Sequence, residues 1–179
     1  MTVKVNKSVL ASKPYKLSTQ KAWLERDKSK VLKLDWNEST ISPSPKVIEA
    51  LTELIQSESI NWYPNTNNSQ LVTLIANYCK VKEQNIQYFN GSDSVHEVIF
   101  KTFSSDGDIL TIIGPTYDHP RSVAECFGLS PDYFDLSSTF DFDIVRFKEH
   151  LLMKMPSIVY VCSPNNPTGN IYSNEIYKK

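Results

Sequence analysis

From residue 86 onwards, short apolar runs alternate with longer segments of helical period, and this alternation constrains the fold more than any other feature. We expect strands at residues 86–89, 109–113, 133–136 and 157–162, and helices at residues 93–103, 117–127 and 143–155. Alternating strands and helices are typical of βαβ units. The sequence therefore predicts an α/β fold, with a mostly parallel sheet and helices on both faces.

Residues before this region have a different pattern. Residues 1–17 are polar and without a period, which indicates an N-terminal arm or a disordered start. A short helix is expected at residues 18–28, and a short extended segment at 31–34. Stronger helix signals begin at Ser44, an N-cap residue followed by proline and an apolar stripe, and we expect Ser69 to cap a second helix.

Charge and hydropathy narrow the class of partner. The net charge is −1 and no long block of like charge occurs, so nothing points to nucleic acid or to an anionic membrane surface. No segment approaches the roughly 20 apolar residues of a membrane helix. We expect a soluble, cytoplasmic protein with a small-molecule ligand.

Cysteine and histidine spacing gives no metal motif. The three cysteines are far apart and lack a C-x-x-C pair, so buried thiols are the expected state. The histidines also lack ligand spacing. We interpret them as structural or surface residues and predict no metal site; they are His96, His119 and His150.

Three polar loops each follow the carboxyl end of a predicted strand, where ligands bind in open α/β sheets. The first runs through Gly91 to Ser92, Asp93 and Ser94 at a helix start, and these residues either cradle a phosphate or form an ordinary helix cap. A Walker lysine and a G-x-G-x-x-G pattern are both absent.

The second loop presents Tyr117, which either stacks on a heteroaromatic ligand or closes the core. The third loop, residues 163–169, reads SPNNPTG and is either a plain turn or a ligand contact through Asn165 and Asn166.

Taken together, the loops closely resemble the first half of a fold-type I pyridoxal-phosphate aminotransferase of class I/II, and in particular the histidinol-phosphate aminotransferase family. The resemblance covers about residues 30–179. It rests on six motifs in order, namely Asp35-Trp36-Asn37-Glu38, Pro43-Ser44-Pro45, Tyr63-Pro64, Asn90-Gly91-Ser92-Asp93, Pro115-Thr116-Tyr117 and Ser163 to Gly169. One departure is Ser94, where many relatives have glutamate.

The resemblance implies roles for eight residues and one coenzyme, pyridoxal 5′-phosphate. Ser92, Asp93 and Ser94 would hold its phosphate, Tyr117 would stack on its ring, and Asn166 would donate a hydrogen bond to its phenolic oxygen. Tyr63 would reach the phosphate of a neighbouring subunit in a homodimer. Asn37 and Glu38 would border the substrate pocket, which takes an amino acid and a 2-oxo acid.

The same resemblance divides the chain into an arm and small-domain segment at 1–43 and the first half of a coenzyme-binding large domain at 44–179. The family's catalytic lysine lies further downstream than this sequence extends, and Lys178 and Lys179 do not match it. We therefore assign no catalytic residue. By ancestry we expect amino-group transfer from an amino acid such as histidinol phosphate or an aromatic substrate, with decarboxylation on the same fold left open, and we expect the isolated chain to be inactive. The alternative is a non-catalytic coenzyme- or phosphate-binding remnant, or a dimerisation partner.

Overall fold

The structure is a computed structural model that describes residues 4–16, 21–39, 41–57, 60–63 and 69–173. The chain divides into two compact units. One contains Met1–Tyr15 and Phe89–Lys179, and the other contains Lys16–Tyr88. The expected domain boundary between residues 43 and 44 stays a prediction.

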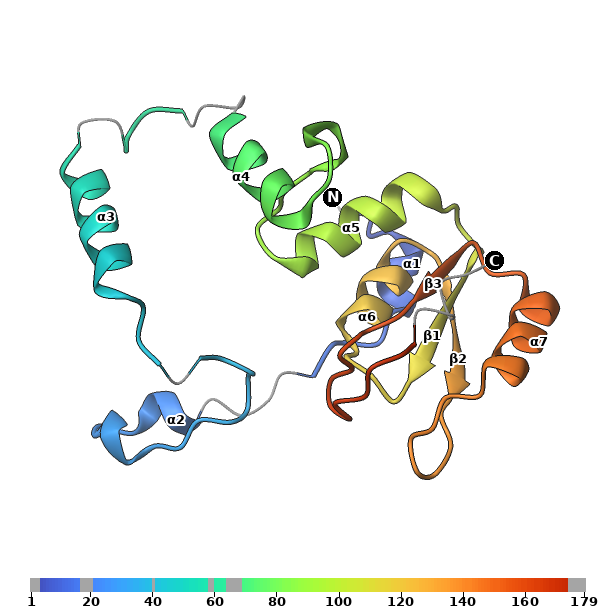
Figure 1. The fold of residues 1–179 in the computed structure, drawn as a ribbon. Coiled ribbons are helices and arrows are strands. Elements are labelled where there is room, and N and C mark those ends of the chain that lie inside the picture. The colour runs from blue at the N-terminus through green and yellow to red at the C-terminus, as the bar shows by residue number, and fades with distance from the viewer. Residues whose placement is uncertain (1–3, 17–20, 40, 58–59, 64–68, 174–179) are drawn as a thin grey trace. The chain divides into compact units, whose positions relative to one another are not determined.

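The first unit is built around a parallel sheet in which β1 lies between β2 and β3 (Figure 1). The strands are β1 (Ile109–Gly114), β2 (Ser130–Asp135) and β3 (Ile158–Tyr160). Helix α6 (His119–Cys126) connects β1 to β2, and α7 (Ile144–Lys154) connects β2 to β3. These crossovers are the βαβ units that the alternation predicts, and they confirm the α/β class with a parallel sheet.

Helices cover both faces of the sheet. Successive side chains of β1 point to opposite faces, and since residues from Leu110 to Gly114 are all buried, both faces are covered. Figure 1 shows α5 (Ser92–Phe103) and α6 on one side and α7 on the other. Two buried clusters fill the two interfaces. The first consists of Phe100, Leu110, Ile112, Ala124 and Leu129, and the second of Ile113, Phe134, Leu136, Phe147 and Tyr172. Burying one such large apolar side chain stabilises the fold by about 1.5–3 kcal/mol.

Capping defines the start of α7. The Asp143 carboxylate accepts hydrogen bonds from the backbone N–H of Val145 at 2.9 Å and of Arg146 at 3.1 Å. These bonds satisfy two of the amide groups that a helix start leaves unpaired. The helix predicted at 143–155 therefore begins one residue later, with Asp143 as its N-cap.

A short N-terminal helix, α1 (Lys7–Ala11), lies in the segment that we expected to lack regular structure. The Asn6 side chain accepts a hydrogen bond from the backbone N–H of Ser8 at 2.9 Å and so starts the helix. Just beyond the helix, the backbone N–H of Lys13 donates to Oε2 of Glu125 on α6 at 2.8 Å. Of the two expectations, a disordered start is wrong for these residues, and an N-terminal arm stays a prediction.

The strand predicted at residues 86–89 is also wrong. These residues pair with no strand in the part of the chain that the structure describes. A strand needs a neighbour to satisfy its backbone groups. Residues 86–88 belong to the second unit, whose described residues contain no strand that could pair with them.

The second unit contains helices but no strand within its described residues. Its helices are α2 (Lys21–Leu24), α3 (Pro45–Gln56) and α4 (Ser69–Cys79), with 3₁₀ turns at Lys28–Lys30 and Glu83–Asn85. Helix α3 starts after Ser44 as predicted, although the Ser44 side chain makes no capping hydrogen bond. The helix predicted at 18–28 is α-helical only at 21–24 and reaches the 3₁₀ turn at residue 28, and residues 18–20 lie outside the described residues.

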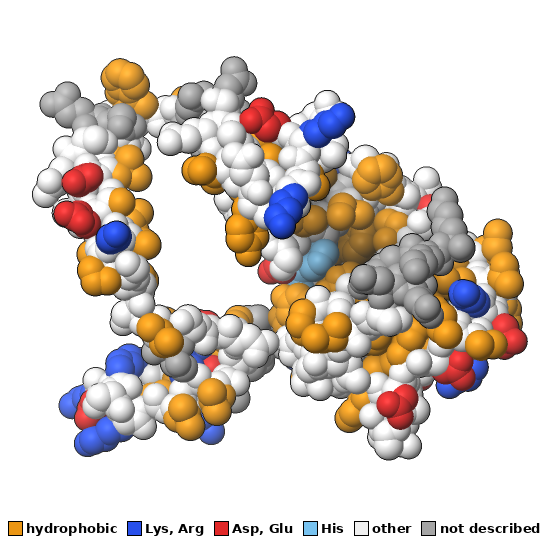
Figure 2. Space-filling model, in the orientation of Figure 1, with side chains coloured by type: hydrophobic (Ala, Val, Ile, Leu, Met, Phe, Trp, Pro, Cys, Tyr) orange, Lys and Arg blue, Asp and Glu red, His pale blue; other side chains and the backbone are white. Residues whose placement is uncertain are grey.

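Helix α3 exposes its apolar stripe within this unit. Figure 2 shows hydrophobic side chains along the helix, and the exposed residues are Val47, Ile48, Leu51, Leu54 and Ile55. Across the described ranges of the chain, the helices are too short or too polar to cross a bilayer.

Candidate functional site

Helix α5 begins at a tight turn whose first residues were predicted to hold a phosphate. Gly91 has φ +82°, a conformation that favours glycine, and its N–H donates to the carbonyl oxygen of Phe89 at 2.9 Å. Ser92 and Asp93 are exposed and Ser94 is half-buried. No side chain caps this helix start. Its first amide groups and the positive end of the helix dipole therefore suit an anion.

Tyr117 lies next to this turn, on the loop that follows β1. Its hydroxyl donates to Oδ1 of Asp93 at 3.3 Å. The Tyr15 ring meets the Tyr117 ring edge-on, with ring centroids 6.4 Å apart. Burial, reinforced by the Asp93 charge, raises the pKa of Tyr117 to about 12. The side chain is therefore a neutral phenol at pH 7, and its hydrogen bond to Asp93 holds it at the N-terminal start of α5.

Asn165 ties the loop after β3 to the loop after β1. Its side-chain nitrogen donates to the carbonyl oxygen of Pro115 at 2.9 Å and to the Thr168 hydroxyl at 2.7 Å. Its side-chain oxygen accepts from the Thr116 hydroxyl at 2.6 Å. The side chain is buried, with 3% of its residue exposed. Asn165 therefore serves the loop structure, and its hydrogen-bonding groups are not left for a ligand.

Asn166 has the opposite character. It is half-buried, and its side chain makes no hydrogen bond to any residue that the structure describes. Asn165 fixes the loop beside it, and its own amide group is left for another partner. The role that the resemblance assigns to Asn166 stays a prediction, and this geometry is compatible with it.

Two histidines, which sequence spacing left unassigned, lie beside Asp93. His96 follows Asp93 by one helical turn on α5, and His119 is the first residue of α6. His119 Nδ1 lies 3.1 Å from Asp93 Oδ1, an ion-pair distance without the alignment of a hydrogen bond. His96 is buried against Phe100 and Tyr160, with ring centroids 6.1 and 5.6 Å away. Burial, and secondly the charge of a protonated His119, lower the pKa of His96.

Sequence reasoning did not bring these residues together because they come from separate elements. The i,i+3 spacing of Asp93 and His96 was a signal for a shared helix face. His119, in contrast, is 23 positions beyond His96 and joins the group only through the packing of α5 against α6.

The remaining predicted site residues belong to the second unit. Asn37 has φ +54° and is exposed, and the Glu38 carboxylate pairs with the Lys33 ammonium group. Tyr63 is 97% exposed. Pro64, the other half of its motif, lies outside the described residues.

Contacts between the loops confirm that they meet at one edge of the sheet. Asp93 of the first loop contacts Tyr117 of the second, and Thr116 of the second contacts Asn165 of the third. The edge thus combines a helix start rich in N–H and O–H donors, an aromatic ring and a side-chain amide. Such a set can hold a flat heteroaromatic molecule that carries a phosphate. The individual ligand roles stay predictions.

Comparisons with known proteins bear on this arrangement. The family described as "Aminotransferase class I and II" matches residues 29–179. The dihydroxyacetone phosphate transaminase Cj1437c of Campylobacter jejuni is 39% identical over 172 residues, which are 96% of this chain and 47% of that protein. The histidinol-phosphate aminotransferase of Methanocaldococcus jannaschii is 32% identical over 147 residues, 80% of this chain and 39% of that protein.

Solved structures show the same fold. Histidinol-phosphate aminotransferase from Sinorhizobium meliloti, in complex with pyridoxal 5′-phosphate, superposes with a TM-score of 0.71 at 19% identity. The match covers 78% of this chain and 37% of that one. The chain spans about half the length, or less, of the curated relatives that it matches.

Proposed function

Because the chain belongs to the class I and II aminotransferases, we propose that it carries the coenzyme-holding part of a pyridoxal 5′-phosphate site in a protein that transfers amino groups. The observation that carries this proposal is the meeting of the three loops through Asp93, Tyr117, Thr116 and Asn165. The family depends on this coenzyme, whose parts are a phosphate, a flat ring and a phenolic oxygen.

The residues present fit those parts. The turn at Ser92, Asp93 and Ser94 offers uncapped helix amides and hydroxyls to the phosphate. The Tyr117 ring offers a flat surface, and Asn166 has a side-chain amide that no described residue occupies. When bound, the coenzyme supplies a ring that draws electrons from the substrate. The protein residues named here bind and orient that ring.

We further propose that the substrate is a small phosphorylated compound. The supporting observation is that the relatives at 39% and 32% identity are named for dihydroxyacetone phosphate and histidinol phosphate. An amino acid and a 2-oxo acid, or carbonyl compounds related to them, would be the two partners of the exchange. Asn37 and Glu38 would border this substrate, Tyr63 would serve a homodimer, and the protein would act in the cytoplasm in a biosynthetic step.

The test is an absorbance titration of the 179-residue chain with pyridoxal 5′-phosphate. Tyr117→Leu and Asn166→Ala should each weaken binding about tenfold, because a ring contact and a hydrogen bond to a charged oxygen are each worth about 1–2 kcal/mol. The exposed α4 residues Tyr78 and Asn77 supply controls, and Tyr78→Leu and Asn77→Ala should leave the affinity unchanged.

The outcome against the proposal is equal affinity in all five proteins. Borohydride reduction followed by mass spectrometry distinguishes non-covalent binding of the coenzyme from a covalent bond between the coenzyme and a lysine. We expect no specific adduct, because no lysine among these residues matches the family's catalytic position. An adduct on one lysine would show that the chain supplies its own covalent anchor.

A further inference from the structure

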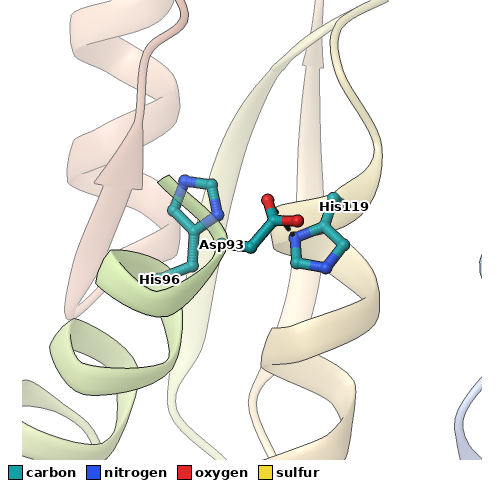
Figure 3. A group of neighbouring side chains, drawn as sticks. All are labelled: Asp93, His96 and His119. Atoms are coloured by element: carbon teal, nitrogen blue, oxygen red, sulfur yellow. Dashed lines mark ion pairs between the residues drawn. The ribbon is translucent and has the colours of Figure 1, made fainter. Parts of the chain in front are cut away.

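Three side chains of metal-ligand type face one another at the junction of α5 and α6. One ligand atom from each of Asp93, His96 and His119 lies within 4.8 Å of the other two. Figure 3 shows the Asp93 carboxylate between the two imidazole rings, each with a nitrogen turned toward it. A single ion placed among these atoms would have three protein ligands.

The burial of His96 gives independent support. The residue is only 9% exposed, and its Nδ1 has no hydrogen-bond partner among the described protein groups. A buried nitrogen without a hydrogen-bond partner destabilises the folded state. A metal ion would satisfy this nitrogen and also balance the Asp93 charge.

The positions of the ligands are fixed by the fold. Asp93 and His96 are one turn apart on α5, and His119 begins α6, which packs against α5 over the same face of the sheet. His96 is held by the Phe100 ring, and the Tyr15 ring meets His119 edge-on at 5.6 Å. Ligands that are held by packing lose little freedom when a metal binds.

We propose that Asp93, His96 and His119 form a binding site for a divalent transition-metal ion, with Zn²⁺ as the best match. Two imidazoles and one carboxylate are typical zinc ligands, and three protein ligands leave a fourth position open. Mg²⁺ and Ca²⁺ prefer oxygen ligands and fit less well. The site shares Asp93 with the proposed phosphate turn, but the proposal does not depend on coenzyme binding.

The test is a calorimetric titration of the full chain with Zn²⁺, without coenzyme or phosphate. Thiols also bind zinc, so the parent protein carries serine at Cys79, Cys126 and Cys162. We expect one Zn²⁺ per chain. His96→Gln and His119→Gln should each weaken binding at least tenfold. The control is His150→Gln, which alters a histidine paired with Asp132 away from the cluster and should change the affinity less than twofold.

Circular dichroism on each variant shows whether a loss of zinc affinity comes from the missing ligand or from loss of the folded structure. If His96→Gln fails to fold, His119→Gln and Asp93→Asn decide the question, because His119 is half-buried and Asp93 is exposed. Absence of saturable binding in the parent overturns the site. So does unchanged affinity in folded His119→Gln and Asp93→Asn, or an equal loss in His150→Gln.

Discussion

Replacing Asn165 by leucine should destabilise the protein by about 3 kcal/mol. Leucine has a similar size but can neither donate nor accept, so the change removes the bonds to Pro115, Thr168 and Thr116. A buried hydrogen bond contributes about 1 kcal/mol net, and three are lost. The Pro115 carbonyl and the two hydroxyls would also lose their partner, which makes the cost larger wherever water cannot reach them.

The measurement is urea unfolding followed by circular dichroism, with the free energy of unfolding extrapolated to water. The matched control is Asn166→Leu, one residue along the same loop, where no hydrogen bond to a described residue is lost. We expect this control to cost less than about 0.5 kcal/mol. It should instead weaken coenzyme binding, whereas Asn165→Leu acts on stability first.

Two results would refute this reasoning. One is a cost below about 1 kcal/mol for Asn165→Leu at an unchanged slope with urea, since the buried bonds would then contribute little. The other is an equal loss of unfolding free energy in both variants, which would show that Asn165 does not have a structural role that Asn166 lacks.

Two further changes test the packing and the charges of the same unit. Gly128→Ala should lower the free energy of unfolding more than Gly107→Ala does in urea unfolding. Both glycines have positive φ, but of the two only Gly128 would bring the new Cβ against a neighbour, Oδ1 of Asp106. Equal costs would mean that Asp106 moves away freely. Asp118→Asn should lower the urea midpoint at pH 7 by a margin that narrows as the pH falls below about 3.8, and a margin independent of pH would contradict this. The reason is that the Arg121 hydrogen bond holds the Asp118 pKa below 3.8, so the stabilisation is present above that pH and is lost as the folded carboxylate takes up its proton.

Strands β1 and β3 were predictable from the sequence because each is marked twice, by an apolar run and by the loop that ends it. Strand β2 begins three residues before the strand predicted at 133–136, because its first residues, Ser130 to Asp132, form no apolar run. β1 is the clearest case, since every residue from Leu110 to Gly114 is buried. The segment 86–89 also carries an apolar signal, but residues 86–88 belong to the second unit, which has no strand among its described residues, and a sequence does not show in which unit a segment packs. Helix α1 escaped notice because five residues are too few to show a helical period.

Part of the candidate site was also predictable from the sequence, and part of it was not. The loops after β1 and β3 were located from the sequence because parallel strands place their carboxyl ends at one edge. The first loop was located by the Gly91 turn and the start of α5, although no strand precedes it. The contrast between a buried structural Asn165 and an unpartnered Asn166 was not visible in the sequence pattern, because adjacent residues of one type differ only in the direction of their side chains. The Asp93, His96 and His119 cluster needed the packing of α5 against α6, which no local spacing records.

The N-terminal segment has a consequence for how the chain is made. Lys13 bonds to Glu125, a partner 112 positions later, and the first fifteen residues share a unit with the last part of the chain. During synthesis these early residues emerge long before α6 exists, and the whole second unit is made in between. Contacts so distant in sequence slow folding. Residues 4–15 therefore lack their folding partner until α6 has been synthesised, and the first unit is complete only when they pack against that later part of the chain.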